Sequence, residues 1–293
     1  MTAYASPDDV ETALRSTGYL PGEGLATVVF LAASMGRPLL LEGEPGTGKT
    51  ALAEALALTA GRELIRLQCY EGIEASQALY DWDFTRQILH IRSVEAAGGT
   101  ELDANRLEAS LFDERFLLAR PILQALQSPG AVLLIDEVDR ADDEFEAFLL
   151  EVLSTFSVSI PEFGEVRAVE PPTVVLTSNR TRDLHDALKR RCLYHWIDHP
   201  TLDQEVAIIG SRLPEVAAVL AAQVAQAAQR LRSVDGLLKP PGVAESLDWA
   251  LALHRLGHDQ LHRAAAERTL GAVVKYREDA DRVRGSLDMI ISA

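Results

Sequence analysis

Eight consecutive residues have the types and spacing needed to hold a chain of phosphates. They read GEPGTGKT, from Gly43 to Thr50, and match the pattern G-x-x-x-x-G-K-[ST]. Glycines at these positions let successive backbone N–H groups turn toward an anion, and the start of the following helix adds positive potential. The pattern predicts a polyphosphate-binding loop made of Gly43, Glu44, Pro45, Gly46, Thr47, Gly48, Lys49 and Thr50.

Within this loop, two side chains have chemical roles of their own. Lys49 would neutralise charge on the β- and γ-phosphates, and the hydroxyl of Thr50 would bind Mg²⁺. Lys49 is one of only four lysines in a chain that otherwise uses arginine. A glycine-rich turn is the structural alternative, and the apolar run before the loop and the helix-forming sequence after it argue against that alternative.

A pair of carboxylates forms the second candidate. Asp136 and Glu137 directly follow the apolar run that begins at Ala131. In parallel sheets, ligands bind at the carboxyl ends of the strands. Asp136 is predicted to hold Mg²⁺, partly through water, and Glu137 to take a proton from the attacking water. An apolar run followed by Asp-Glu is common by itself, and the loop upstream is what favours hydrolysis.

Two further polar features follow later in the chain. Asn179 comes after the apolar run that begins at Thr173 and would orient the attacking water or contact the γ-phosphate. Taken alone, an asparagine after a strand is more often a turn residue. Arg190 and Arg191 stand at a predicted helix end, where cations are favourable for purely structural reasons. The functional alternative is an arginine finger that reaches the γ-phosphate of a neighbouring subunit.

Five short apolar runs would position these residues. They are mostly separated by helical segments, which predicts an α/β fold with a parallel sheet. The predicted strands are Pro38–Glu42, Glu63–Cys69, Ala131–Ile135, Thr173–Thr177 and Leu193–Ile197. Helices are predicted from the Ser6-Pro7 start signal, over residues 24–35 and over Thr50–Ala60.

Two segments interrupt this alternation. Residues 70–93 contain Tyr80, Trp82 and Phe84 and an alternating pattern at Gln87–Arg92, which together predict an inserted hairpin. Its aromatic residues either pack within the hairpin or face a client protein. Residues 156–169 predict a second hairpin.

After Pro200 the sequence is rich in Ala and Leu and helical in pattern. Four helices are predicted there, over residues 203–213, 214–232, 243–256 and 261–284. The expected domains are an α/β nucleotide-binding domain over residues 1–200 and an all-α lid domain over residues 201–293.

Composition narrows the class of protein. Of 293 residues, 47% are apolar and 25% charged, which is ordinary globular usage. The net charge of −16 argues against non-specific binding to nucleic acid or anionic lipid. Two cysteines suit a reducing cytosol, and the longest apolar stretch is about half of a membrane span. We therefore expect a cytoplasmic protein with no stable membrane insertion and no nucleic-acid partner.

The chain resembles an AAA+ ATPase in four features and in their order: the loop 43–50, the carboxylates at 136–137, Asn179 and the arginines at 190–191. An all-helical domain follows them, as it does in that class. The details are similar to the MoxR family, whose DE-(I/V)-(N/D)-R-A signature resembles DEVDRA at 136–141. The family carries a helix-2 insert and a hairpin before sensor 1 at the places of the two interruptions. More narrowly, LQCYEG at 67–72 and the stretches 176–200 and 239–250 resemble the CoxD-like ATPases encoded with aerobic carbon monoxide dehydrogenase.

The resemblance implies an AAA+ core with a parallel five-stranded sheet, and ATP with Mg²⁺ as cofactors. It implies a ring homo-oligomer, a hexamer, that hydrolyses ATP between subunits and remodels the apoprotein of a metalloenzyme, here a molybdenum hydroxylase. By matching positions, Asn179 is sensor 1 and Arg191 the arginine finger, with Arg190 as the alternative. A von Willebrand factor A-type partner is also possible. The chain departs from the family at Ser246, where an arginine called sensor 2 is usual.

Three other functions remain open at this point. The departure at Ser246 favours a nucleotide-gated scaffold without productive turnover, whereas Glu137 and Asn179 disfavour it. The chain could instead be the motor subunit of another metal-insertion, chelatase-like complex. A nucleic-acid motor or an activator of transcription is disfavoured by the net charge.

Overall fold

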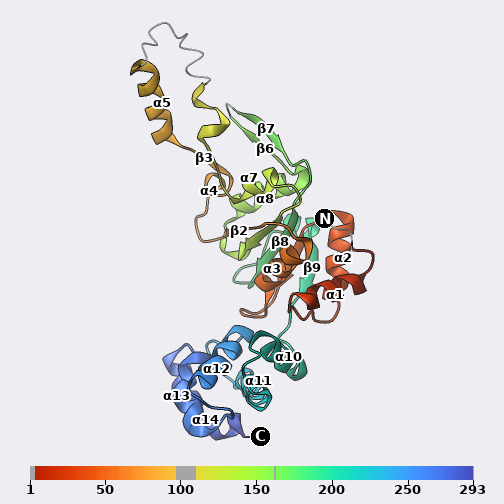
Figure 1. The fold of residues 1–293 in the computed structure, drawn as a ribbon, viewed down its shortest axis with the longest axis vertical. Coiled ribbons are helices and arrows are strands. Elements are labelled where there is room, and N and C mark those ends of the chain that lie inside the picture. The colour runs from red at the N-terminus through yellow and green to blue at the C-terminus, as the bar shows by residue number, and fades with distance from the viewer. Residues whose placement is uncertain (1–3, 97–109, 162, 293) are drawn as a thin grey trace. The chain divides into compact units, whose positions relative to one another are not determined.

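The computed structural model describes residues 4–96, 110–161 and 163–292, and two compact units make up the chain (Figure 1). The first unit contains Leu31–Leu40 and Leu56–Tyr194. The second contains Tyr4–Phe30, Leu41–Ala55 and the chain from His195 onward. The expected domain boundary at 200/201 stays a prediction.

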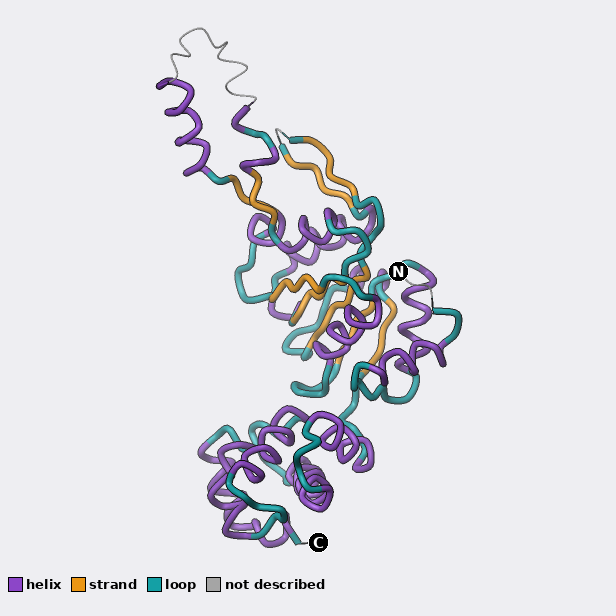
Figure 2. Tube along the Cα trace, viewed as in Figure 1, coloured by secondary structure: helices purple, strands orange, loops and turns teal. Residues whose placement is uncertain are grey.

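The central element is a five-stranded sheet with the strand order β2-β5-β8-β1-β9 (Figure 2). Its strands are β1 (Leu39–Glu42), β2 (Leu64–Gln68), β5 (Val132–Asp136), β8 (Thr173–Ser178) and β9 (Leu193–Trp196). β2 pairs with β5 and β5 with β8 in parallel, with Gln68 opposite Asp136 and Ile135 opposite Leu176. The parallel sheet confirms the predicted α/β fold class. β5 is buried at every position, as expected for a strand covered on both faces.

Helices alternate with these strands, and local signals fix where several of them begin. The helices are α1 (Pro7–Ser16), α2 (Leu25–Met35), α3 (Lys49–Ala60), α7 (Pro121–Gln127), α8 (Asp143–Thr155) and α9 (Asp186–Arg191). The Ser6 hydroxyl accepts a hydrogen bond from the N–H of Asp9, as the start signal predicts. The carboxylate of Asp142 caps α8 by accepting from the N–H of Phe145.

The segment 70–93 is not a hairpin, and that prediction was wrong. It forms α4 (Ala75–Leu79), β3 (Tyr80–Trp82) and the start of α5 (Phe84–Ala96). β3 pairs antiparallel with β4 (Leu117–Ala119), which comes later in the chain. The reason is Asp83, whose carboxylate accepts from the N–H of Arg86 and so caps a helix where alternation of side chains suggested a strand. The rings of Tyr80 and Trp82 make an edge-to-face contact, with their centroids 6.1 Å apart.

The second interruption does form the predicted hairpin. β6 (Ser157–Ile160) and β7 (Gly164–Arg167) pair antiparallel, with Val158 opposite Val166. Phe156, at φ 47°, ends α8 in the left-handed region and turns the chain into β6.

Residues 202–291 are all-helical, as predicted, but form five helices instead of four. These are α10 (Leu202–Arg212), α11 (Ala218–Arg232), α12 (Val243–Arg255), α13 (Arg263–Val273) and α14 (Arg277–Ile291). The predicted helix 261–284 is broken between α13 and α14, where Val274 and Tyr276 have extended backbone. Residues 274–276 include no glycine or proline, so the usual signals for the end of a helix are absent at this break. These helices share one apolar core around Trp249, separate from the apolar core of the first unit.

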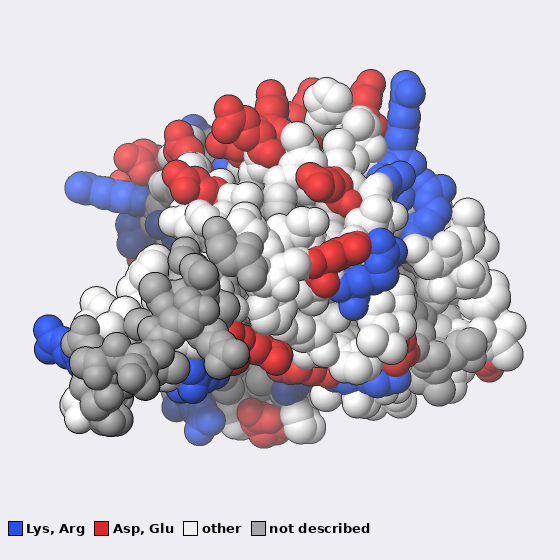
Figure 3. Space-filling view, turned by 90° about the horizontal axis from the view of Figure 1, so that it is seen from above, with Lys and Arg blue, Asp and Glu red and all other residues white. Residues whose placement is uncertain are grey.

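The surface of the described residues agrees with the net charge. Acidic side chains gather along one border of the face in Figure 3, and basic side chains lie at separate places on it. Among the helices that the structure describes, none is long and apolar enough to cross a bilayer.

Candidate functional site

The loop between β1 and α3 is shaped by its backbone. Gly46 and Gly48 have φ angles of +79° and +95°, which residues with a Cβ rarely adopt. The Lys49 ammonium donates to the carbonyl oxygens of Gly43 at 2.7 Å and Glu44 at 2.8 Å. The Thr47 hydroxyl donates to the same Glu44 oxygen at 2.9 Å. The side chains of Lys49 and Thr47 therefore brace the backbone of their own loop.

Gly43 is required by a close approach of two backbone segments. A Cβ at this position would lie 2.3 Å from the carbonyl oxygen of Ile197. The N–H of Ile197 in turn donates to the carbonyl of Glu42 at 2.7 Å. The first residue of the loop therefore packs on the chain that follows β9, and no side chain fits between them.

The same loop also touches the start of α12. The N–H of Val243 donates to the carbonyl oxygen of Gly46 at 2.9 Å. A Cβ on Gly242 would lie 2.8 Å from the Cα of Gly46. All these residues belong to the second unit.

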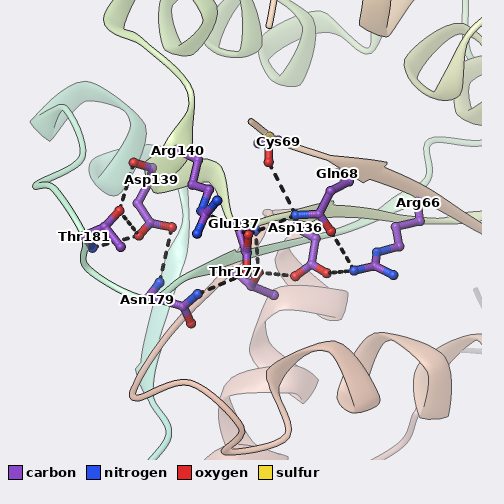
Figure 4. Close-up of polar contacts among 10 residues, drawn as sticks. All are labelled: Arg66, Gln68, Cys69, Asp136, Glu137, Asp139, Arg140, Thr177, Asn179 and Thr181. Carbon is purple, nitrogen blue, oxygen red and sulfur yellow. Dashed lines mark hydrogen bonds and ion pairs between the residues drawn. The ribbon is translucent and has the colours of Figure 1, made fainter. Parts of the chain in front are cut away.

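In the first unit, Asp136 ends β5 with its side chain buried and bonded from both neighbouring strands (Figure 4). The Thr177 hydroxyl, from β8, donates to Oδ1 at 2.5 Å. The Arg66 guanidinium, from β2, donates to Oδ2 at 2.5 Å. These two bonds fix the Asp136 carboxylate at the end of β5.

Glu137 follows in a strained conformation, with φ 54° and ψ 49°. Its N–H donates to the Thr177 hydroxyl at 2.9 Å, so one hydroxyl of β8 bonds both the Asp136 carboxylate and the Glu137 backbone. Its carboxylate accepts from the side-chain amides of Asn179 at 3.3 Å and Gln68 at 3.1 Å. It also pairs with Arg140 at 3.3 Å. A left-handed conformation of this kind costs about 1–3 kcal/mol and is typical of functional sites.

Asp139 fixes the segment that carries Asn179. Its side chain is 2% exposed and accepts from the N–H groups of Asn179 at 3.2 Å and Thr181 at 2.8 Å. The Thr181 hydroxyl adds a third bond at 2.7 Å. A buried carboxylate with several donors thus sets where the Asn179 amide lies relative to Glu137 (Figure 4).

Cys69 lies next to this edge but is chemically quiet. Its N–H donates to the carbonyl of Asp136 at 2.9 Å. Burial raises the pKa of the Cys69 thiol to about 12, and the negative charge of nearby carboxylates, first Asp136, acts in the same direction. The thiol is therefore protonated at neutral pH, as suits a core residue and not a metal ligand.

Arg190 and Arg191 are both exposed at the end of α9. The Arg191 guanidinium bonds the Ser154 hydroxyl. Arg37 donates to the carbonyl oxygens of Arg191 and Cys192 at 3.1 Å each and so satisfies the last carbonyl groups of the helix. A finger role for either arginine stays a prediction.

The sequence analysis predicted Asp136, Glu137 and Asn179, and the structure brings these three together in the first unit. The sequence analysis did not identify the residues that bond these three, which are Arg66, Gln68, Thr177, Asp139 and Arg140. One signal was present: Arg66 and Gln68 alternate with buried Ile65 and Leu67 along β2, so they share its exposed face.

In each unit by itself, the residue types suit one part of a magnesium nucleotide. The Thr50 hydroxyl and the Asp136 carboxylate are oxygen donors of the kind that Mg²⁺ prefers. The glycines at positive φ make a cradle that a Cβ would fill, and Lys49 supplies the cation. A glycine-rich loop between a strand and a helix, with acidic residues at the end of another parallel strand, defines the class of P-loop ATPases.

Comparison with known families makes this assignment specific. Residues 38–192 match the AAA domain family (dynein-related subfamily), and the chain therefore belongs to that family. Members of this family use ATP with Mg²⁺, so the matched part of the chain is an ATPase domain that uses both.

Individual similar proteins give less information about this chain than the family match does. The chain is 28% identical over 221 residues to the uncharacterized protein YehL of Escherichia coli K12. That match covers 71% of this chain and 54% of YehL, so the chain spans about half the length of this relative. Two solved structures of RuvB mutants from Thermotoga maritima are similar, with TM-scores of 0.51 and 0.50. At 17% and 18% identity, over 98% of this chain and 78% and 79% of theirs, they show the fold alone.

Proposed function

We propose that this protein uses ATP hydrolysis to remodel another protein. The observation that carries the proposal is the network in which Glu137 is held by Asn179 and linked through Thr177 to Asp136. A carboxylate fixed at a strand end, with an amide beside it, is an arrangement suited to activating a water molecule.

We assign the residues of the loop to binding. The N–H groups of the loop and the ammonium of Lys49 hold the phosphates, and Lys49 is already oriented by two carbonyl groups. Thr50 and Asp136 hold Mg²⁺, the latter partly through water. When bound, Mg²⁺ neutralises charge that develops on the phosphates.

We assign the residues of the acidic edge to the chemical step. Glu137 accepts the proton of the attacking water at a carboxylate oxygen, and the Asn179 amide orients that water. Gln68 and Arg140 keep the carboxylate in place, because both bond Oε2 and leave Oε1 to Asn179.

Replacing the base tests this assignment. Glu137→Gln should bind ATP with unchanged affinity and lose turnover by about 10²–10⁴-fold, the usual contribution of a general base. Steady-state phosphate release and calorimetric titration with ATP measure the two properties. Glu144→Gln, an exposed position on α8, is the matched control. Unchanged turnover in Glu137→Gln would refute the catalytic role.

The arrangement of subunits is part of the proposal. We propose a ring, a homo-hexamer, in which the exposed Arg191 acts on nucleotide bound by a neighbour. Arg191→Ala and Lys49→Ala proteins should each be inactive, and their mixture should recover part of the turnover because some interfaces then hold both groups. Recovery absent at every mixing ratio would count against catalysis between subunits. Arg190→Ala in the same assay decides between the two arginines.

The client is proposed from the resemblance of 67–72, 176–200 and 239–250 to CoxD-like ATPases of the MoxR family. We propose that the client is the apoprotein of a molybdenum hydroxylase such as carbon monoxide dehydrogenase, met in the cytoplasm, with a von Willebrand factor A-type partner. Co-expression of that enzyme with wild-type chain or with Glu137→Gln tests this. Full metal loading in both cases would contradict it.

A second candidate is a nucleotide-gated scaffold, favoured by Ser246 at the place of the usual arginine. A single-turnover assay with radiolabelled ATP separates the two, since a scaffold binds ATP and releases no phosphate. A motor subunit of a chelatase-like complex differs in its client and would show metal-insertion activity with a porphyrin substrate.

A further inference from the structure

A buried ion pair within residues 202–291 is hydrogen-bonded to the Pro241-Gly242 turn, and that turn contacts the phosphate loop. Glu205 on α10 is fully buried, and the Arg232 side chain, at the end of α11, is 10% exposed. Two nitrogen atoms of Arg232 donate to the two oxygen atoms of Glu205, at 2.7 and 2.6 Å. Both oxygen atoms are thus matched in the two-fold geometry that only arginine provides.

The third nitrogen of Arg232 reaches a different segment. Its Nε donates to the carbonyl oxygen of Pro241 at 2.7 Å. The Ser246 hydroxyl, on α12, donates to Glu205 at 2.6 Å and is fully buried. Three helices and the Pro241-Gly242 turn therefore meet at one polar point inside an otherwise apolar region.

That turn is the segment in contact with the phosphate loop. Gly242 approaches Gly46 so closely that a Cβ on either glycine would lie 2.8–3.0 Å from the Cα of the other. The next residue, Val243, donates its N–H to the carbonyl of Gly46 at 2.9 Å. An anion-binding loop needs its N–H groups turned inward and its carbonyl groups turned outward, and an outward carbonyl is stabilised by a donor from outside the loop.

We propose that Arg232, together with Glu205 and Ser246, is a positioning residue for nucleotide binding: it holds the Pro241-Gly242 turn so that Val243 fixes the Gly46 peptide of the phosphate loop. This inference rests on the proposed function, because it gives the helical region a part in binding ATP. It also gives Ser246 a structural task at a position where the resembling family has an arginine. Arg232 acts through the loop and touches no phosphate.

Substitution of Arg232 tests the proposal in the full chain. Arg232→Lys keeps the charge but loses the Nε bond to Pro241, and the affinity for ADP and ATP should fall about tenfold. The turnover at saturating ATP should change less than twofold, because the acidic edge is untouched. Ser246→Ala should weaken affinity by about two- to threefold. Calorimetric titration and steady-state kinetics measure these values.

Two further measurements separate positioning from folding. Arg263→Lys is the matched control, since Arg263 pairs with Asp288 between α13 and α14, away from the loop. The double substitution Glu205→Met with Arg232→Met removes the ion pair while filling its volume, which buried pairs often tolerate. It should keep the melting temperature and still bind nucleotide weakly. Without any nucleotide, hydrogen exchange at the amide of Val243 should be faster in Arg232→Lys than in wild type.

The outcomes are distinct. Wild-type affinity in both Arg232→Lys and the double variant overturns the inference. An affinity loss that Arg263→Lys shares at an equal drop in melting temperature also overturns it, because the effect is then general destabilisation. If the wild-type chain itself binds neither ADP nor ATP, the proposed function fails, and the exchange of Val243 still reports whether Arg232 holds the loop contact.

Discussion

The phosphate loop and the acidic edge are built in opposite ways. The loop of Gly43–Thr50 gets its form from glycine backbone and from carbonyl groups that its own lysine and threonine take up. The acidic edge gets its form from side chains of several strands, with Thr177 between Asp136 and Glu137 and with Asp139 behind Asn179. The loop is therefore sensitive to added atoms, and the edge to a change of hydrogen-bonding group.

The largest effect should come from adding one carbon to the loop. In Gly43→Ala the Cβ would meet the Ile197 carbonyl at 2.3 Å, so one of two backbone segments must move. Overpacking of this kind costs about 1–3 kcal/mol, and we expect nucleotide affinity to fall about tenfold or more. Calorimetric titration with ADP measures it. Gly22→Ala is the control, because nothing lies within 4 Å of a Cβ there. Equal affinity in both variants would show that the loop tolerates side chains.

A smaller effect should follow when the edge loses one charge and keeps its shape. Asp139→Asn replaces a buried carboxylate that accepts from Asn179 and Thr181 by an amide that must also place two donor hydrogens. We expect a loss of about 1–3 kcal/mol in the free energy of unfolding. Turnover should fall about tenfold as Asn179 shifts, while ADP affinity stays within twofold. Urea unfolding and phosphate release measure both. A loss of ADP affinity equal to the loss of turnover would contradict the separation of loop and edge.

The same contrast explains what sequence could predict. The loop is contiguous and works through its backbone, so its motif alone indicated each residue. The edge is assembled from β2, β5 and β8, and no spacing reveals that Arg66 reaches Asp136 or that Thr177 bonds the Asp136 carboxylate and the Glu137 N–H. Arg232, Glu205 and Ser246 were hidden for the same reason, since they come from three helices.

The prediction of secondary structure failed where a local contact opposed the pattern of apolar residues. The alternation around Gln87–Arg92 suggested a strand, whereas the cap at Asp83 starts α5. At the break between α13 and α14, Val273 and Val274 are both buried in the helical core, a tertiary contact that local sequence does not reveal. By contrast, β1 and β5 were predicted because strands buried inside a parallel sheet are nearly continuous apolar runs.

The smallest expected effect concerns His199, which lies in the second unit near charges of both signs. Burial lowers the pKa of His199, the positive charge of Arg232 lowers it further, and Glu205, Glu44 and Asp198 oppose this. The unfolded chain has the ordinary histidine pKa of about 6.5, so below that pH the unfolded state binds more protons than the folded state. Stability should therefore be unaffected by His199 above about pH 6.5 and should fall as the pH drops toward the folded pKa.

His199→Gln should remove this part of the acid sensitivity. Because the imidazole is partly exposed and solvent screens its charge, we expect a difference of only a few tenths of a kcal/mol. Urea unfolding of both proteins at pH 7.5 and pH 5.5 measures it, with the variant losing less stability than wild type between the two pH values. An equal loss in both proteins would mean that His199 is not among the groups that sense acid. A larger loss of ADP affinity at pH 5.5 in wild type than in the variant would link His199 to the phosphate loop. The reason is that a protonated His199 repels Arg232, which holds the Pro241-Gly242 turn against that loop.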